Sequence, residues 1–281
     1  MKITFKCPIC LKEENRNGKT SSLCNNCGCL INLKAKNYDY TDEGGQNIPD
    51  IKKHHSRLEN CKLRFKIIKK FINNNQLFVD IGTGSGEMII ASKKFFKKSL
   101  GFEHSKKLVN FYIENQIEVY NSDFDFEKIR PFLKKDTTIL YSFNHVLEHN
   151  FNPLKLINNT ISNHNKVVIY IEVPLYTGLS FKDQGENWKL WYDQHNALYS
   201  MNTLKFISKK LDMQILDHGF RTFISDSYST KKNIFLFIKY PIRFIKTCLM
   251  YPFNRKNTFM DIFLKDYGYV IISKENNQNA F

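Results

Sequence analysis

The fold of this chain is decided by the stretch Phe78-Val79-Asp80-Ile81-Gly82-Thr83-Gly84-Ser85-Gly86-Glu87, in which a short apolar run meets a glycine-rich turn. The turn opens a segment of helical periodicity, so the pattern predicts a strand, a loop and a helix in succession. Glycines at alternate positions remove every Cβ where a ligand must approach the backbone, and the helix N-terminus adds unpaired N–H donors. The stretch therefore predicts a ligand-binding loop at the end of a buried strand.

Strands and helices alternate around this loop. Short apolar runs predict buried strands at residues 77–80, 99–103, 137–142 and 167–173. Helical patterns occupy residues 63–72, 87–97, 106–115 and 154–163. This alternation implies βαβ units and a parallel sheet whose faces are covered by helices. Residues 267–274 add a further strand, which we expect to be the antiparallel last strand of the sheet.

An acidic residue, Glu103, ends the second of these strands, 17 residues after Gly86. In dinucleotide-binding folds an acid at this position accepts hydrogen bonds from ribose hydroxyls, so Glu103 predicts a ribose-bearing cofactor. The phosphate-binding fingerprint G-x-G-x-x-G is not matched, because the third glycine falls two positions after the second rather than three. Asp80, just before the loop, would also repel a pyrophosphate. The residues therefore favour a cofactor with an amine or cationic portion.

The sequence resembles the class I S-adenosylmethionine-dependent methyltransferases over about residues 61–220. Five landmarks carry the resemblance, and they come in the order of that family: Asp80-Ile81-Gly82-Thr83-Gly84-Ser85-Gly86; Gly101-Phe102-Glu103; Asn121-Ser122-Asp123-Phe124; Ser142-Phe143-Asn144-His145-Val146-Leu147-Glu148-His149 with Asn152-Pro153; and Glu172-Val173-Pro174. The resemblance implies an α/β fold, with a Rossmann-like, seven-stranded, mostly parallel sheet and helices on both faces. S-adenosylmethionine would bind at the carboxyl ends of the strands.

The same resemblance assigns roles to individual residues. The loop glycines would line the methionine portion of the cofactor, and Glu103 would hold the ribose diol. Asp123 would reach the adenine amino group, with Phe124 beside it. The expected cofactor-binding set is Asp80, Gly82, Thr83, Gly84, Gly86, Glu103, Asp123, Phe124, Asn144 and His145.

The acceptor site is expected in the segment that follows the fifth strand. Both tryptophans of the chain lie there, and amphipathic rings beside polar groups suit a sugar or another polar ring. Residues 195–204 resemble a segment common in small-molecule and sugar methyltransferases of this class. A hydroxyl acceptor needs a base, and histidine titrates near neutrality, so His195 is the predicted base, with His149 second and Tyr192 beside them. The alternative is that His195 merely holds the loop.

Five of the seven cysteines lie before residue 30. Cys7-Pro8-Ile9-Cys10 and Cys24-Asn25-Asn26-Cys27 are two C-x-x-C turns separated by 13 residues. Two such turns present the four thiolates that Zn²⁺ takes in closed structural sites. Cys7, Cys10, Cys24 and Cys27 are therefore the predicted zinc ligands, and Cys29 could substitute for Cys27. A redox dithiol is the competing interpretation, although it would need only one pair.

The chain has 281 residues and a formal net charge of +15, with 35 Lys and 7 Arg. Phosphate-binding sites favour the Arg fork, so this charge alone does not establish a nucleic-acid partner. The sequence has neither an apolar run of membrane-spanning length nor a signal peptide, which predicts a cytoplasmic protein. From Tyr228 to Lys256 there are seven basic residues and no acid. We favour a packed helical insertion there; the alternative is a helix lying peripherally on the inner face of a membrane.

These patterns predict four segments: a zinc-ribbon-like module at 1–40, a connector at 41–60, a cofactor-binding methyltransferase domain at 61–227, and a basic helical insertion with the last strand at 228–281. The predicted activity is methyl transfer to a hydroxyl of a small molecule or glycan intermediate, such as a nucleotide-linked sugar or a surface-polysaccharide unit. Two alternatives stay open. One is an RNA methyltransferase whose zinc ribbon and basic tail hold phosphate, and the other is a cofactor-binding scaffold without turnover.

Overall fold

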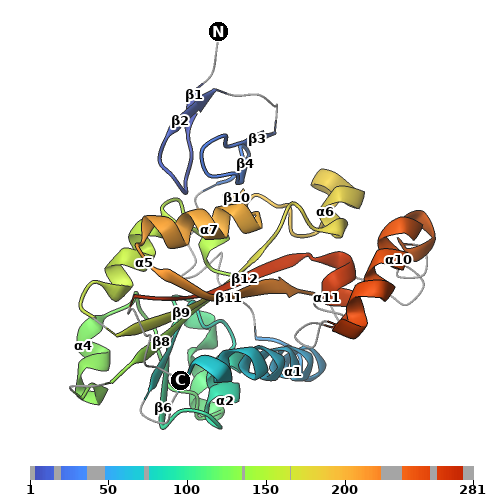
Figure 1. Cartoon of the computed structure of the whole chain (residues 1–281). Coiled ribbons are helices and arrows are strands. Elements are labelled where there is room, and N and C mark those ends of the chain that lie inside the picture. The colour runs from blue at the N-terminus through green and yellow to red at the C-terminus, as the bar shows by residue number, and fades with distance from the viewer. Residues whose placement is uncertain are drawn as a thin grey trace.

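The structure, a computed structural model, describes residues 4–15, 20–36, 48–72, 76–134, 137–164, 166–222, 236–253 and 258–274. A seven-stranded sheet in the order β11-β12-β9-β8-β5-β6-β7 forms its centre (Figure 1). Its strands are β5 (Leu77–Ile81), β6 (Lys98–Phe102), β7 (Val119–Tyr120), β8 (Ile139–Asn144), β9 (Val167–Pro174), β11 (Gln214–Arg221) and β12 (Tyr267–Ser273). The pairs from β7 to β9 are parallel, and β12 is antiparallel to both of its neighbours. The predicted mostly parallel sheet and its antiparallel last strand are therefore confirmed.

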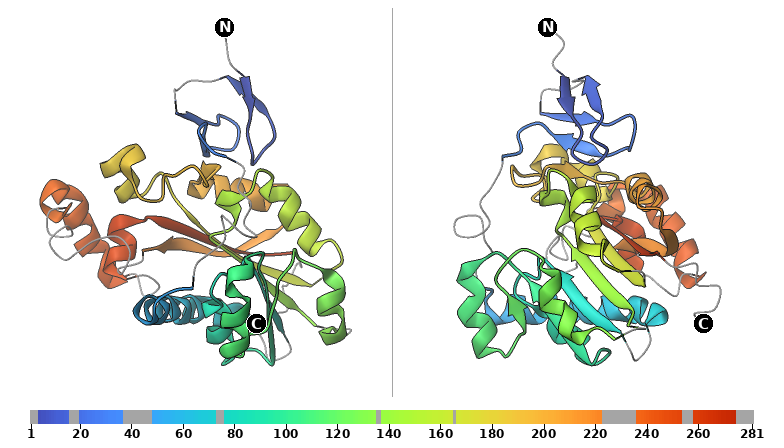
Figure 2. Two further views of the ribbon diagram at one scale, coloured as in Figure 1. Left: turned by 180° about the vertical axis from the view of Figure 1, so that it is seen from behind. Right: turned by 90° about the vertical axis from the view of Figure 1, so that its left-hand side faces the viewer.

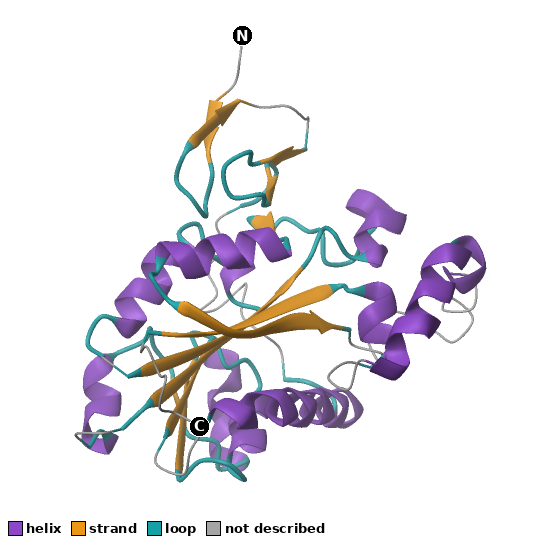
Figure 3. Ribbon diagram, viewed as in Figure 1, coloured by secondary structure: helices purple, strands orange, loops and turns teal. Residues whose placement is uncertain are grey.

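Helices cover both faces of this sheet, as Figure 3 shows. One face carries α1 (Ile51–Ile68), α2 (Glu87–Ser92) and α3 (Val109–Glu114), and the other carries α4 (Phe126–Ile129), α5 (Pro153–Ile161) and α7 (Met201–Lys210). Neighbouring residues of β5 point into different cores, Phe78 into the first and Val79 into the second. A pleated strand buried on both faces requires this alternation, which explains the unbroken apolar run in the sequence.

Short helical turns connect these elements. They are η1 (Lys69–Phe71), η2 (Lys106–Leu108), η3 (Arg130–Phe132), η4 (Leu147–His149), η5 (Gly185–Asn187) and η6 (Tyr251–Phe253), and η5 continues α6 (Leu179–Gln184). η4 directly follows β8, so it places the end of the family's fourth-strand motif at the carboxyl edge of the sheet. Substrate and cofactor sites of open α/β sheets lie at this edge.

Helix α1 begins at Ile51, inside the segment predicted as a connector and 12 residues before the predicted helix start at residue 63. The Asp50 side chain caps it by accepting a 2.8 Å hydrogen bond from the Lys53 amide. The first turns of α1 are largely exposed, with Ile51 90% exposed, and carry no apolar stripe. Periodicity therefore detected only the buried half of the helix.

The N-terminal segment forms two small sheets that stand apart from the central one (Figure 2). β1 (Thr4–Lys6) pairs with β2 (Glu13–Asn15), and β3 (Ser21–Leu23) pairs with β4 (Leu30–Asn32). β4 also pairs with β10 (Ala197–Leu198), which lies in the segment after β9. The N-terminal module is thus joined by backbone hydrogen bonds to the predicted acceptor segment.

At one lateral edge of the central sheet (Figure 1), α10 (Pro241–Met250) packs on α11 (Phe259–Leu264). Leu236, Phe263 and Leu264 form an apolar core with Leu179 of α6. The expected helical insertion at 228–281 remains a prediction, since residues 228–235, 254–257 and 275–281 lie outside the described residues. Among the residues that the structure describes, no helix combines the length and apolar character needed to cross a membrane.

Candidate functional site

The loop between β5 and α2 has a backbone that suits glycine. Gly82, Gly84 and Gly86 have φ angles of +66°, +54° and +82°, in the left-handed region. A Cβ on Gly82 would lie 2.6 Å from Cγ2 of Val146, so the close approach of the two segments needs a bare backbone. The amide of Gly84 donates a 2.8 Å hydrogen bond to Oε2 of Glu103, which fixes the loop to the end of β6.

A cavity of about 310 Å³ brings together Glu103, Asp123 and Phe124. Glu103 is buried, and its Oε1 accepts a 3.0 Å hydrogen bond from the Ser105 amide. The Asp123 carboxylate is 89% exposed and lies 2.9 Å from Nε2 of His104. The sequence-predicted ribose and adenine residues therefore share one cavity, with an acid and an aromatic ring on its wall.

A second cavity, of about 240 Å³, lies beside the glycine loop and includes Asp80, Thr83, Asn144 and His145 in its lining. Asp80 is 1% exposed and accepts a 2.7 Å hydrogen bond from the Thr83 hydroxyl. Burial raises the pKa of Asp80 to about 7. A buried carboxylate is costly without a cationic partner, so this position fits a ligand that brings positive charge. Oδ1 of Asn144 is buried and accepts no hydrogen bond from the described residues, which leaves an acceptor for the ligand.

Two arginines of α1 line the same cavity, and the sequence analysis missed both. Arg57 donates from Nη1 to the Ser85 hydroxyl at 3.1 Å. Arg64 is buried and contacts both oxygens of Glu172, with Nη2 2.5 Å from Oε1. The ion pair holds the pKa of Glu172 well below its usual range despite burial. The sequence did offer one signal for these residues, because Arg is scarce in this Lys-rich chain. The planar guanidinium of Arg binds a carboxylate with two parallel hydrogen bonds, which Lys cannot do, so a rare Arg is a candidate for a buried ion pair.

His145 lines both cavities and bridges two buried carboxylates. Its Nδ1 lies 3.3 Å from Oε1 of Glu148, and its Nε2 lies 3.3 Å from Oε1 of Glu172. Burial alone would lower the pKa of His145, but the two carboxylates raise it to about 9. The residue also has a positive φ of +59°, a backbone conformation that is rare outside glycine. His145 is therefore charged at pH 7 and held in a strained position by its partners.

The three candidate catalytic residues meet where the two cavities join. His149 and Tyr192 line both cavities, and His195 lines the smaller one. The ring centre of His195 lies 4.5 Å from that of His149 and 4.2 Å from that of Tyr192. Burial lowers the pKa of His195 to about 3 and lowers that of His149 as well. Both imidazoles are consequently neutral at pH 7.

Backbone contacts hold this segment from two sides. Asn196 donates from its amide to the carbonyl of Glu148 and from its side chain to the carbonyl of His149, both at 2.7 Å. On the other side, the Asn32 side chain of the N-terminal module donates to the carbonyl of His195 at 3.0 Å. The position of His195 thus depends on η4 and on the N-terminal module together.

The two tryptophans line neither of these cavities. Trp188 and Trp191 are 3% and 8% exposed, and both rings pack edge-on against Phe181. They form an apolar cluster with Leu198 of β10. The expectation that they present rings to an acceptor is wrong, because their volume fills the space between this segment and α6.

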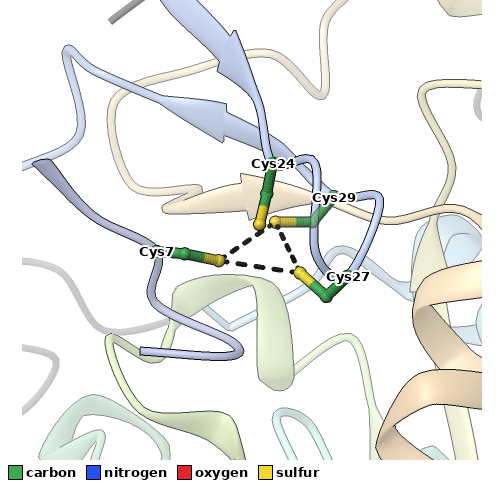
Figure 4. A group of neighbouring side chains, drawn as sticks. All are labelled: Cys7, Cys24, Cys27 and Cys29. Atoms are coloured by element: carbon green, nitrogen blue, oxygen red, sulfur yellow. Dashed lines mark hydrogen bonds between the residues drawn. The ribbon is translucent and has the colours of Figure 1, made fainter. Parts of the chain in front are cut away.

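The N-terminal cysteines gather into one cluster. Figure 4 shows Cys7, Cys24, Cys27 and Cys29 pointing their sulfurs toward one another, and all four atoms lie within 4.8 Å of each other. Cys10 lies at the margin, with its sulfur 3.5 Å from that of Cys24. The group whose sulfurs are all mutually close therefore contains three of the four predicted ligands, Cys7, Cys24 and Cys27, with Cys29 in the place predicted for Cys10. A set of four thiolates in this arrangement fits tetrahedral Zn²⁺.

The turn that carries two of these thiols contacts the acceptor side of the molecule. The carbonyl of Gly28 accepts hydrogen bonds from the Ser200 hydroxyl at 2.9 Å and from the Tyr176 hydroxyl at 3.2 Å. Ser200 also caps α7, since its side chain accepts a hydrogen bond from the Thr203 amide. The cysteine cluster is thus connected directly to the start of a helix of the central domain.

The sheet order, the glycine loop at its carboxyl edge and the acid on the neighbouring strand define a class I S-adenosylmethionine-dependent methyltransferase. More particularly, a family model described as a methyltransferase domain matches residues 53–218, more than half of the chain. The chain belongs to this methyltransferase domain family. No curated protein matches its sequence.

Several solved structures are similar to this chain. A SAM-dependent methyltransferase from Archaeoglobus fulgidus is 20% identical, with a TM-score of 0.49 over 77% of this chain and 94% of that one. The plantazolicin methyltransferase BpumL in complex with SAH is 15% identical, with a TM-score of 0.48 over 81% and 91%. Magnesium protoporphyrin IX methyltransferase from Synechocystis PCC 6803, with bound SAH, is 11% identical, with a TM-score of 0.47 over 82% and 90%.

Proposed function

We propose that this enzyme methylates a hydroxyl of a small polar acceptor, a glycan intermediate such as a nucleotide-linked sugar or a surface-polysaccharide unit. The observation that carries the proposal is the convergence of His149, Tyr192 and His195 at the junction of the two cavities. Two neutral imidazoles beside a phenol supply hydrogen-bonding groups in a partly apolar cleft, which suits a ring that bears several hydroxyls.

In this proposal the larger cavity receives the adenosine portion of S-adenosylmethionine, on Glu103, Asp123 and Phe124. The smaller cavity receives the methionine portion, with Asp80 facing its ammonium group. The remaining cofactor contacts are proposed for Gly82, Thr83, Gly84, Gly86, Asn144 and His145. When bound, the cofactor supplies an electrophilic methyl group on a sulfonium centre. The chain contributes alignment of the two reactants and exclusion of water.

Methylation of a hydroxyl forms an O–C bond and releases the hydroxyl proton, so a group of the chain must accept it. We propose His195 as this base and His149 as its second candidate, with Tyr192 hydrogen-bonding to the acceptor. Because the pKa of His195 is lowered to about 3, the ring is neutral at pH 7 and can accept a proton, although weakly. Most of the acceleration would then come from alignment rather than from basicity.

Transfer of isotopically labelled methyl from the cofactor to fractionated cell extract tests the acceptor class. We expect label in a sugar-containing fraction, and His195→Ala should reduce transfer at least about tenfold while S-adenosylmethionine affinity is unchanged. Label in a nuclease-sensitive fraction would instead identify an RNA methyltransferase. Cofactor binding without transfer to any fraction would identify a scaffold. Either of these outcomes overturns the proposal.

We further propose that the cysteine cluster holds a structural Zn²⁺. The five clustered cysteines are free thiols in the structure, and the module that carries them adds few other buried apolar residues, Ile9 and Ile31, to a core that it shares with the central domain. In such a segment, metal binding supplies a large part of the folding free energy.

We also propose that α10 rests on an anionic membrane surface. Ile242, Ile245 and Leu249 form a stripe on its outer side and are 82%, 58% and 68% exposed, and Ile238 extends the stripe at 73%. A groove of about 750 Å³ beside the helix is lined by the basic residues Lys182, Lys239, Arg243, Lys246 and Lys265. An exposed apolar stripe next to clustered positive charge is complementary to acyl chains and anionic headgroups.

A further inference from the structure

We propose that Glu148, His149 and His195 bind a divalent transition-metal ion at the acceptor end of the site, where it would contact the hydroxyl to be methylated. This inference rests on the proposed function for the identity of the acceptor, but the metal site itself rests only on the geometry. With the metal bound, His195 would act on the acceptor as a metal ligand instead of as the base, and the hydroxyl proton would be released to solvent.

The three side chains offer one ligand atom each, and these atoms all lie within 4.8 Å of one another. Two of the residues are adjacent in η4, and the third comes from the loop before β10. The hydrogen bonds of Asn196 to the carbonyls of Glu148 and His149 hold the two segments together. The ligand set is therefore assembled by backbone contacts that do not use the ligand atoms.

The hydrogen bond of His149 fixes its ring in the form that a metal requires. Nδ1 lies 3.1 Å from the carbonyl oxygen of Gln194, and a carbonyl can only accept, so Nδ1 carries the proton. Nε2 then carries the lone pair. Metal-binding histidines typically donate their second ring nitrogen to a backbone carbonyl or carboxylate in this way.

The carboxylate of Glu148 supplies the second, independent observation. Glu148 is 1% exposed, and neither of its oxygens accepts a hydrogen bond from the described residues. The ring of His145 lies at an ion-pair distance of 3.3 Å from one oxygen. The charged ring of His145 partners Oε1, whereas Oε2 accepts no hydrogen bond from the described residues. Buried carboxylate oxygens are ordinarily hydrogen-bonded or bound to metal, so Oε2 points to a second cation.

Two imidazoles and one carboxylate suit first-row transition metals such as Mn²⁺, Fe²⁺, Co²⁺ or Zn²⁺ better than Mg²⁺. Three protein ligands leave coordination positions open, which is typical of catalytic rather than structural metals. His149 lines both cavities, so open positions would face the junction of the two cavities, where the acceptor hydroxyl would meet the methyl group. A metal there would lower the pKa of a bound hydroxyl and would orient an acceptor that offers two neighbouring hydroxyls.

Manganese titration of the full-length protein, followed by electron paramagnetic resonance, tests the site without cofactor or acceptor. Mn²⁺ prefers oxygen and nitrogen ligands to thiolates, so it should bypass the cysteine cluster. We expect one bound Mn²⁺ per chain, lost in Glu148→Gln and in His195→Gln. The control His218→Ala removes an exposed histidine of β11 and should bind Mn²⁺ like the natural protein.

Affinity for S-adenosylmethionine, measured on the same samples, shows whether each variant is folded. If the folded natural protein binds no Mn²⁺, or if the two ligand variants bind it with unchanged affinity, the metal site is wrong. The proposed function would still stand if methyl transfer to a sugar fraction persisted in that metal-free protein. Conversely, stoichiometric Mn²⁺ binding with no hydroxyl acceptor found would retain the metal site and reject the proposed function.

Discussion

At the scale of single residues, the left-handed backbone of Gly84 is the feature on which the proposed cofactor site depends most directly. Its φ of +54° disfavours any branched side chain, and its amide is committed to Glu103. We expect Gly84→Val to abolish measurable affinity for S-adenosylmethionine in titration calorimetry, because the loop would have to leave its position against β6. Zinc content should be unchanged, since the loop does not contact the cysteine cluster. Retained affinity would show that this loop does not hold the cofactor.

Asp80, which we propose to face the ammonium group of the cofactor, lowers the stability of the protein when no cofactor is bound. Its pKa rises from 3.8 to about 7 on folding because of burial, so the unfolded chain releases the proton first as the pH rises. Stability is therefore lost progressively between about pH 4 and pH 7 and stays lower above that range, by about 1.4 kcal/mol for each pKa unit.

We therefore expect Asp80→Asn to stabilise the cofactor-free protein in urea unfolding at pH 8, with little difference at pH 4. The variant should bind S-adenosylmethionine more weakly, because a neutral amide does not attract the ammonium group. Ser99→Ala, a small change on the next strand, provides a comparison variant whose stability difference should not vary with pH. Equal stability of Asp80→Asn and the natural protein at pH 8 would contradict the argument.

The sequence identified the residues whose role depends on near neighbours in the chain, and it missed those whose partners are distant in sequence. The loop glycines and Glu103 stand next to a strand end, so their spacing alone predicts a cofactor-binding edge. The pairing of Arg64 with Glu172 joins residues 108 positions apart, and no local pattern encodes it. For the tryptophans the error was a false assignment rather than a missed one. Aromatic residues near a site can pack in the core or contact a ligand, and the sequence alone does not distinguish these two roles.

At the scale of secondary-structure elements, α10 has the clearest consequence. We expect the double variant Ile242→Asp/Leu249→Asp to reduce sedimentation with phosphatidylglycerol-containing vesicles at least about tenfold, because it places two charges where acyl chains would lie. Vesicles of phosphatidylcholine alone, and high salt, should also weaken binding.

Ile113→Asp is the matched control, since Ile113 is 71% exposed but lies on α3. If the double variant sediments like the natural protein, α10 does not contact the bilayer. If no vesicles bind but the chain dimerises through this stripe, the covering partner is a second copy of the chain rather than lipid.

The elements also differ in how well the sequence predicted them. Strands buried on both faces, such as β5 and β9, appear as continuous apolar runs and were found nearly at their true bounds. β4 and β10 are short, and they pair across residues 30–32 and 197–198, which only the tertiary fold brings together. The proposed four-segment division remains a prediction, and α1 begins inside the segment that it treats as a connector.

At the scale of the whole molecule, the N-terminal module is built into the acceptor side of the enzyme. We expect chelation of the proposed zinc, or Cys27→Ser, to lower the melting temperature and kcat, because Asn32 and Gly28 would no longer hold the loop around His195 and Ser200. Affinity for S-adenosylmethionine should change by less than about twofold, since the glycine loop is supported by β6. Elemental analysis, thermal unfolding and steady-state kinetics measure the three effects. Full activity in zinc-free protein would show that the module does not support the site.

The place of β12 in the sheet has a consequence for synthesis on the ribosome. β12 inserts between β9 and β11, although it follows both in the chain. While residues 267–273 are still in the ribosomal exit tunnel, β12 cannot pair. The edges of β9 and β11 that β12 will cover are then exposed. Open edges recruit other chains, so the nascent protein is prone to aggregate until β12 has left the tunnel and paired.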